Sequence, residues 1–237
     1  YVQMAMAYAS IKKESVALRW LADLRRKAQK IHDLRAVAAS YANEGFWIYS
    51  ANGDYRRAFA AFQQSLEIYQ KIGDELNISL IDACTGRLRL SLGELDRAEE
   101  CAGRALELGR KVGYPVSIAL SNTIIGTVSL CRGTIEEAEK AYASSIRIGQ
   151  TTGVAKLSAD AIVQSGRAPL AQGKRLRARK RFIEAIRTVS QWESNLLSFA
   201  GAVSGLEEAI DDPDEYRSTC EKLQADLSSE DVSISRW

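Results

Sequence analysis

The sequence predicts an all-α chain built from repeated pairs of helices, and three observations support this fold class. Small residues recur at a fixed interval of 40 positions along most of the 237 residues. Apolar residues follow the spacing of one helix face, as in Ala58, Phe62, Leu66 and Tyr69. No segment alternates apolar and polar residues for long enough to indicate a strand. Such periodicity is typical of proteins that stack one supersecondary unit many times.

Four series of small residues define the repeat. Two glycine series have the spacing expected of turns: Gly53, Gly93, Gly133 and Gly173, with Pro213 at the next step, and Gly73, Gly113 and Gly153. The third series is Gly86, Gly126 and Gly166, and the fourth is Ala58, Ala98, Ala138 and Ala178. Each glycine of the third series precedes an alanine of the fourth by twelve residues. Four series with one period indicate a structural repeat.

Each repeat is predicted to contain two helices. First helices are expected over Glu75 to Leu92, Val116 to Arg132 and Ala155 to Gln172, each ending at a glycine that can adopt positive φ. Second helices are expected over about eighteen residues, as in Asp54 to Ile72 and Glu94 to Val112. Acidic residues in the first turns of the second helices favour these starts, because the helix dipole stabilises negative charge there.

The glycines in the middle of the first helices need a packing reason. Each costs about 1 kcal/mol relative to alanine in helix propensity. We expect a neighbouring helix to approach closely at Gly86, Gly126 and Gly166, with the alanine of the second helix as the small partner.

This pattern resembles the tetratricopeptide repeat (TPR), in which a first-helix glycine is followed by alanine, three residues and an aromatic. Gly126 with Ala138 and Tyr142, and Gly166 with Ala178 and Phe182, match it. The resemblance implies a right-handed superhelical solenoid of antiparallel helix pairs. The 40-residue period, against the usual 34 of the family, predicts that each helix is about one turn longer. Long repeats of this kind are similar to those of MalT-like activators, Rap-type regulators and kinesin light chains.

The resemblance covers residues 34–193 as four repeats, namely 34–73, 74–113, 114–153 and 154–193. Residues 1–33 are expected to form a divergent N-terminal repeat, because residues 28–33 resemble residues 69–74. Residues 194–227 are expected to form a capping repeat, with helices over 194–210 and 214–227, and residues 228–237 a tail or linker. Because the chain begins with Tyr1 in a helical segment, we expect further domains of the same polypeptide.

Composition and charge exclude several classes of protein. The chain has 32 basic and 30 acidic residues and 46% hydrophobic residues, which is not the composition of a disordered protein. No apolar run could span a membrane, and charges at Lys12, Lys13 and Arg19 interrupt any signal-peptide core. We therefore expect a cytoplasmic location.

Residue types that carry catalysis or bind cofactors are scarce. His32 is the only histidine, and its position at a predicted helix end suggests a C-cap. The four cysteines lack the spacing of metal sites and are expected to be reduced and to pack as small hydrophobes. No phosphate-binding loop, dinucleotide fingerprint or zinc-protease motif is present. The sequence predicts a protein that is not an enzyme and that has no cofactor or metal.

By the resemblance, the first helices line a concave groove, and the chain is a protein-interaction or peptide-binding scaffold or sensor in a larger bacterial signalling or transcription-regulatory protein. The positions expected to face the groove include Asn43, Trp47, Arg87, Thr123, Thr127, Asp160 and Arg167. Arginine and tryptophan are frequent interface anchors, although packing or solvation also explains each residue. The lysine and asparagine set that grips chaperone tails is missing, which disfavours that ligand.

A basic segment allows an alternative interaction. Residues 174–181 contain Lys174, Arg175, Arg177, Arg179, Lys180 and Arg181 at the start of a second helix, where other repeats carry acids. The segment could bind nucleic-acid phosphates or an acidic protein, or it could be a solvated face neutralised by Asp211, Asp212, Asp214 and Glu215. No aromatic residues interleave to stack bases, so nucleic acid is the less favoured partner. A sensor of small molecules or signalling peptides is a third hypothesis.

Overall fold

A computed structural model describes residues 1–153, 159–190 and 196–229. Within these ranges all regular secondary structure is helical, which confirms the predicted all-α class. The first half contains α1 (Val2–Ser10), α2 (Glu14–Lys30), α3 (Leu34–Asn43), the π-helix η1 (Glu44–Ser50), α4 (Tyr55–Ile72), α5 (Glu75–Ser91) and α6 (Leu95–Lys111). The second half contains α7 (Pro115–Cys131), α8 (Ile135–Thr152), α9 (Ala159–Ala171), α10 (Arg175–Ser190), α11 (Leu196–Ala209) and α12 (Pro213–Ser229).

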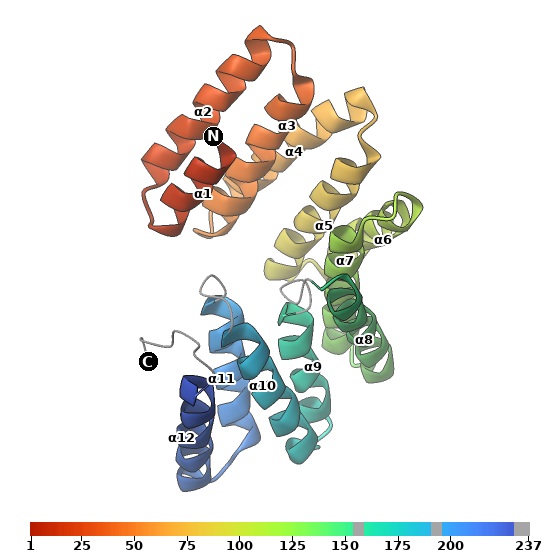
Figure 1. Cartoon of the computed structure of the whole chain (residues 1–237). Coiled ribbons are helices and arrows are strands. Elements are labelled where there is room, and N and C mark those ends of the chain that lie inside the picture. Colours follow the sequence, from red (N-terminus) through yellow and green to blue (C-terminus); the bar gives the residue numbers. More distant parts are fainter. Residues whose placement is uncertain (154–158, 191–195, 230–237) are drawn as a thin grey trace. The chain divides into compact units, whose positions relative to one another are not determined.

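The chain divides into two compact units, Tyr1–Ile124 and Ile125–Trp237, with the boundary inside α7. In the first unit successive helices pack as antiparallel neighbours, as Figure 1 shows for α2, α3 and α4. One core cluster brings α3, α4 and α5 together around the buried Phe62 and Tyr69. A smaller cluster joins α1, α2 and η1 around Leu21 and Ile48. Each helix is therefore held by the helices next to it in sequence.

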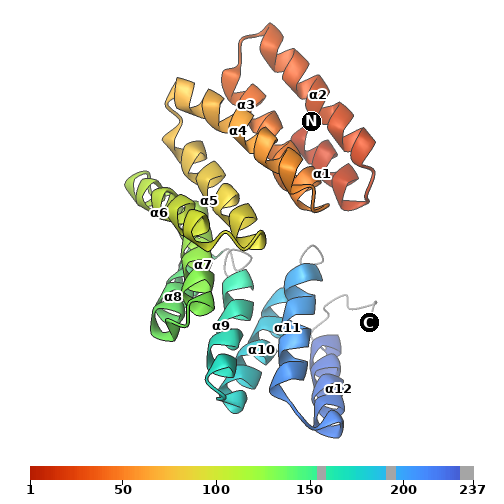
Figure 2. The ribbon, with the colours of Figure 1, turned by 180° about the vertical axis from the view of Figure 1, so that it is seen from behind.

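The second unit repeats this arrangement with its own core. Helices α9, α10 and α11 follow one another as neighbours, which Figure 2 shows from behind. Phe182 and Ile186 of α10 are fully buried, and they belong to one hydrophobic cluster with Leu206 of α11 and Leu223 of α12. Helices α11 and α12 overlap the helices predicted over 194–210 and 214–227, of which residues 194 and 195 lie outside the described residues. The predicted start at Ala155 and residues 230–237 lie outside the described residues.

Most turns between helices use a residue in the left-handed conformation. The glycines predicted to end helices all have φ between 67° and 81°: Gly53, Gly73, Gly93, Gly113, Gly133, Gly153 and Gly173. In the divergent first repeat, Lys12 and His32 occupy this position with φ of 57° and 56°. His32 therefore ends its helix through its backbone, whose N–H donates to the Gln29 carbonyl at 3.2 Å.

Mid-helix glycines make room for a neighbouring helix, but the group they accommodate differs from the prediction. A Cβ on Gly126 would lie 2.7 Å from Cε1 of Tyr142, and one on Gly166 would lie 2.6 Å from Cε1 of Phe182. The partner is thus the aromatic ring four residues after the alanine. Gly86 differs, because Ala102 stands at the position of the aromatic residue. A Cβ on Gly86 would lie nearest to a backbone atom, the carbonyl oxygen of Ala98, at 3.1 Å.

The second repeat contains one residue more than the predicted period, and η1 accommodates it. A Cβ on Gly45 would lie 2.5 Å from Cε1 of Phe62, so Gly45 is the structural equivalent of Gly86. Gly45 precedes its turn glycine, Gly53, by eight residues, whereas Gly86 precedes Gly93 by seven. The π-helix η1 (Glu44–Ser50) contains Gly45 and most of the interval to Gly53, as expected for an insertion absorbed within a helix.

Cysteine burial corrects one expectation. Cys84 and Cys101 are buried as predicted, but Cys131 is exposed at the end of α7 and Cys220 is half-buried. Packing as small hydrophobes is therefore wrong for Cys131, because it lies where its helix leaves the core.

Candidate interaction surfaces

The residues predicted for a binding face are divided between the two units. Asn43, Trp47, Arg87 and Thr123 belong to the first unit, whereas Thr127, Asp160 and Arg167 belong to the second. All seven lie on first helices or on the π-helix that extends α3.

In the first unit, η1 and α5 bring together Phe46, Trp47 and Arg87, which we call the aromatic–arginine cluster. The Arg87 guanidinium carbon lies 4.9 Å from the centroid of the Phe46 ring. The rings of Phe46 and Trp47 meet edge to face, with centroids 4.7 Å apart. All three side chains are half-buried. The cluster combines a cation and two aromatic surfaces, the residue types most frequent at the centres of protein interfaces.

Phe46 is the member of this cluster that the 40-residue spacing does not predict. Because Gly45 is equivalent to Gly86, the residue after it, Phe46, is equivalent to Arg87. Trp47 instead packs beside Ile48 against the cluster formed with α1 and α2. The signal was present in the sequence as the eight-residue interval between Gly45 and Gly53, but only the structure shows that Gly45 belongs to the series.

The polar residues predicted for the binding face are largely engaged with their own helices. The Asn43 amide donates to the Ala39 carbonyl at 2.7 Å, and the buried Thr123 hydroxyl donates to the Ala119 carbonyl at 3.0 Å. In the second unit, the Tyr142 hydroxyl donates to Thr127 Oγ1 at 3.2 Å. Burial raises the pKa of Tyr142 to about 12, so its hydroxyl stays protonated at neutral pH. Arg167 and Asp160 are exposed on α9.

A buried ion pair anchors the start of η1. Glu44 is 8% exposed and pairs with Arg25 of α2, whose Nε also donates to Ser40 Oγ at 2.9 Å. The Arg25 guanidinium carbon lies 3.8 Å from the Tyr41 ring centroid. Burial raises the pKa of Glu44 above its ordinary value, and the positive charge of Arg25 opposes that shift. This pair ties η1 to α2 and thereby positions the aromatic–arginine cluster.

The basic segment of α10 is largely paired with acids. Arg175 pairs with Asp211, Arg179 with Glu215, Arg177 with Glu139 at 3.0 Å and Arg181 with Glu184 at 3.2 Å. Asp211 and Glu215 come from the next repeat, as one of the sequence hypotheses expected. Among the described residues, only Lys174 and Lys180 of the six basic side chains have no ion-pair partner. Most of the positive charge is therefore balanced locally.

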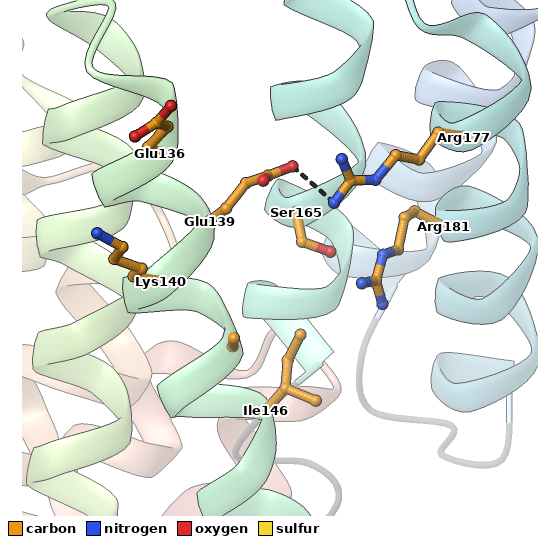
Figure 3. A pocket seen from close by; sticks show the side chains of 8 residues that line it. Glu136, Glu139, Lys140, Ile146, Ser165, Arg177 and Arg181 are labelled. Atoms are coloured by element: carbon orange, nitrogen blue, oxygen red, sulfur yellow. Dashed lines mark ion pairs between the residues drawn. The ribbon is translucent and has the colours of Figure 1, made fainter.

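A cleft of about 400 Å³ lies between α8 and α10 (Figure 3). Glu136, Glu139 and Lys140 come from α8, Arg177 and Arg181 from α10, and Ser165 of α9 also lines it. The Ser165 hydroxyl donates to the Ile162 carbonyl at 2.7 Å. The Glu139–Arg177 ion pair crosses the cleft (Figure 3), so the charges of both signs are partly satisfied by one another.

Across 1–153, 159–190 and 196–229, no group of three or more His, Cys, Asp or Glu side chains could hold a metal ion. Among the helices of the same ranges, none has the length and apolar character that crossing a bilayer requires.

Solved structures of low sequence identity share this fold. No protein-family model matches the chain, and no curated protein matches it. BtubC (BKLC) from P. vanneervenii superposes with a TM-score of 0.64 at 16% identity, over 100% of this chain and 96% of that one. A signal transduction ATPase with a tetratricopeptide repeat sensor from Pyrococcus horikoshii superposes with a TM-score of 0.65 at 20% identity, over 97% of this chain and 36% of that one.

A third solved structure contains the nearly identical TPR-like repeats of a Podosopora anserina protein described as a kinesin light chain. It superposes with a TM-score of 0.53 at 16% identity, over 86% of this chain and 97% of that one. Together with the repeated helix pairs, these likenesses show that the chain has a tetratricopeptide-like solenoid fold.

Proposed function

We propose that the chain is a non-catalytic module that binds a protein or peptide partner through the first-helix face of its TPR-like repeats. The aromatic–arginine cluster is the observation that carries this proposal. A solenoid of helix pairs buries each pair against its neighbours and leaves the first-helix face for a partner. Half-buried aromatic rings beside a guanidinium provide anchors that lose little conformational entropy on binding.

The module acts as the scaffold or sensor part of a larger bacterial signalling or transcription-regulatory protein. Support comes from the signal transduction ATPase, whose tetratricopeptide repeat sensor is part of a longer chain. The present chain spans 36% of that protein's length.

The basic segment of α10 does not favour a second function. Four of its six cations pair with Asp211, Glu139, Glu215 and Glu184. The affinity of a protein for nucleic acid rises when its cations displace counterions from the phosphates. Cations that are already paired with acids contribute less to this affinity. Contact through the basic segment with nucleic acid or an acidic protein stays a prediction.

Affinity capture tests the proposed binding face. The intact chain is immobilised, and proteins retained from an extract of the source cells are quantified by mass spectrometry. Phe46→Leu combined with Trp47→Leu should weaken capture of the specific partner by about tenfold, because both rings are lost while apolar character is kept. Gln64→Ala combined with Gln70→Ala, both exposed on α4, is the control and should leave capture unchanged. Equal capture by both double variants would refute the assignment.

A further inference from the structure

Arg87 is a half-buried cation that lacks a carboxylate partner within the described ranges of the chain. The other half-buried arginines there each pair with an acid: Arg25 with Glu44, Arg89 with Glu94, Arg179 with Glu215 and Arg181 with Glu184. The Arg87 guanidinium carbon lies over the Phe46 ring, 4.9 Å from the ring centroid. A partly desolvated charge without a counter-charge is unfavourable, so a binding partner that supplies one gains affinity.

Acidic residues on the surrounding first helices are already engaged elsewhere. Glu44 of η1 pairs with Arg25, and Asp82 of α5 pairs with Arg104 at 3.2 Å. Glu75, the remaining acid of α5, pairs with Lys111 at 2.5 Å. The α3 segment and α7 contain no acidic residue at all.

The neighbouring thiol does not balance the charge either. Cys84 is one turn before Arg87 on α5, and it is buried. Burial raises the pKa of the Cys84 thiol, which therefore remains neutral at physiological pH.

We propose that Arg87, oriented by Phe46, binds an acidic side chain of the partner peptide. This inference rests on the proposed function and names the chemistry of the ligand. A guanidinium stacked on a ring keeps the N–H groups on its edge available, and that edge matches a carboxylate with two parallel hydrogen bonds. The cluster contains a single cation, so a carboxylate with one negative charge fits it better than a phosphate dianion.

Selection of peptides tests the inference with the intact chain. A library of random 12-residue peptides is displayed and selected on the wild type, Arg87→Lys, Arg87→Gln and the control Arg110→Gln. Arg110 is exposed at the end of α6 and loses the same charge. The wild type and the control should enrich Asp or Glu at one position, Arg87→Lys should show a weaker enrichment because an ammonium keeps the charge but not the two parallel hydrogen bonds, and Arg87→Gln should lose it. Circular dichroism and thermal melting verify that every variant is folded.

Binding constants of the peptide selected on the wild type give the magnitude. Replacing its enriched acid by Gln, or Arg87 by Gln, should each raise Kd by about ten- to a hundredfold, and the two changes together should cost little more than either alone. Acid enrichment that persists on Arg87→Gln, or additive effects, would overturn the inference. Tighter Arg87-dependent binding of a phosphoserine analogue would also overturn it, in favour of a phosphate.

The selection also separates the two proposals. Peptides that bind the wild type, lose affinity on the Phe46→Leu and Trp47→Leu double variant and show no acidic preference would leave the proposed function standing and remove this inference. A selection that enriches no peptide would count against both.

Discussion

At the scale of single residues, a glycine in a first helix and an aromatic ring in a second helix form one packing unit. Tyr142 and Phe182 are fully buried, and each ring occupies the space that a side chain at Gly126 or Gly166 would need. The helix-propensity cost of the glycine, about 1 kcal/mol, is offset by burial of the ring, which contributes about 1.5–3 kcal/mol.

Alanine at two mid-helix glycines should therefore have opposite effects. Gly126→Ala should lower the free energy of unfolding by about 1–3 kcal/mol, because its Cβ would lie 2.7 Å from Cε1 of Tyr142. Gly103→Ala is the matched control, because no atom of a neighbouring residue lies within 4 Å of its Cβ position on α6. It should raise the free energy of unfolding by up to about 1 kcal/mol. Urea denaturation followed by circular dichroism measures both, and two effects of the same sign would contradict the packing argument.

At the scale of elements, η1 is the structural consequence of one additional residue in the second repeat. The Ser50 hydroxyl donates to the Gly45 carbonyl at 2.6 Å, so a side chain helps to satisfy the widened turn. The insertion also shifts the register of η1, so that Gly45 packs on Phe62 of α4 and Phe46 is the residue that follows it. As a result Phe46, rather than Trp47, lies below Arg87.

Removing one residue should be tolerated in η1 and harmful in α5. Deletion of Ala51 restores the seven-residue interval between Gly45 and Gly53 and should change the free energy of unfolding by less than about 1 kcal/mol. Deletion of Ser91, which is equally exposed and also two residues before its turn glycine, should cost about 2–5 kcal/mol. The physical reason is that a lost residue changes the helix register by about 100° at that point, so the buried Leu88 and the turn at Gly93 cannot both keep their positions.

Thermal and urea melts of the two deletion variants provide the comparison. Similar losses for both deletions would mean that η1 does not hold the additional residue. The Ala51 deletion should also weaken capture of the partner, because Trp47 and Phe46 lie within the rearranged segment.

At the scale of the whole molecule, the two units have separate cores. The cluster around Phe62 belongs to Tyr1–Ile124, and the cluster around Phe182 belongs to the second unit. In a repeat protein each repeat contacts only its neighbours. A mutation therefore lowers stability mainly in the repeats around it, more so than in a globular domain.

Phe182→Ala should therefore destabilise one unit more than the other. Loss of this fully buried ring should cost about 3–5 kcal/mol in the second unit. Amide hydrogen exchange should show protection reduced by at least about a hundredfold in α10 and α11, with little change in α2 and α3. Ala61→Gly on α4 is a milder control for the first unit. An equal loss of protection throughout the chain would show that it unfolds as one cooperative unit.

Much of the fold was predictable because the repeat supplies its own internal comparison. Turn glycines, such as Gly93 and Gly133, need a positive φ that other residues adopt at a cost, so their period marks the helix ends directly. The predicted helix from Glu75 to Leu92 agrees within one residue with α5. The predicted alanine partner was right at Gly86, where Ala98 lies nearest, and wrong at Gly126 and Gly166, where an aromatic ring lies nearest. Spacing places an alanine and an aromatic on the same helix face without showing which one reaches the glycine.

The candidate site was predictable only in part. Arg87 and Trp47 were selected by their position in the repeat, whereas Phe46 was missed because a uniform period hides an insertion within one helix. The basic segment was visible as a run of charge, but its neutralisation depends on Asp211 and Glu215 of the following repeat, more than thirty residues away. Local sequence does not specify which distant acid a cation meets.

The sequence by itself determined the class of this protein: a 40-residue period of turn glycines and helix-face apolar residues permits only stacked helix pairs. Tertiary structure decided where the second repeat places its additional residue, which arginines meet an acid and which ring lies under Arg87. The reason is physical. Helix formation and turns depend on residues a few positions apart, whereas the pairing of charges and rings depends on how neighbouring helices pack.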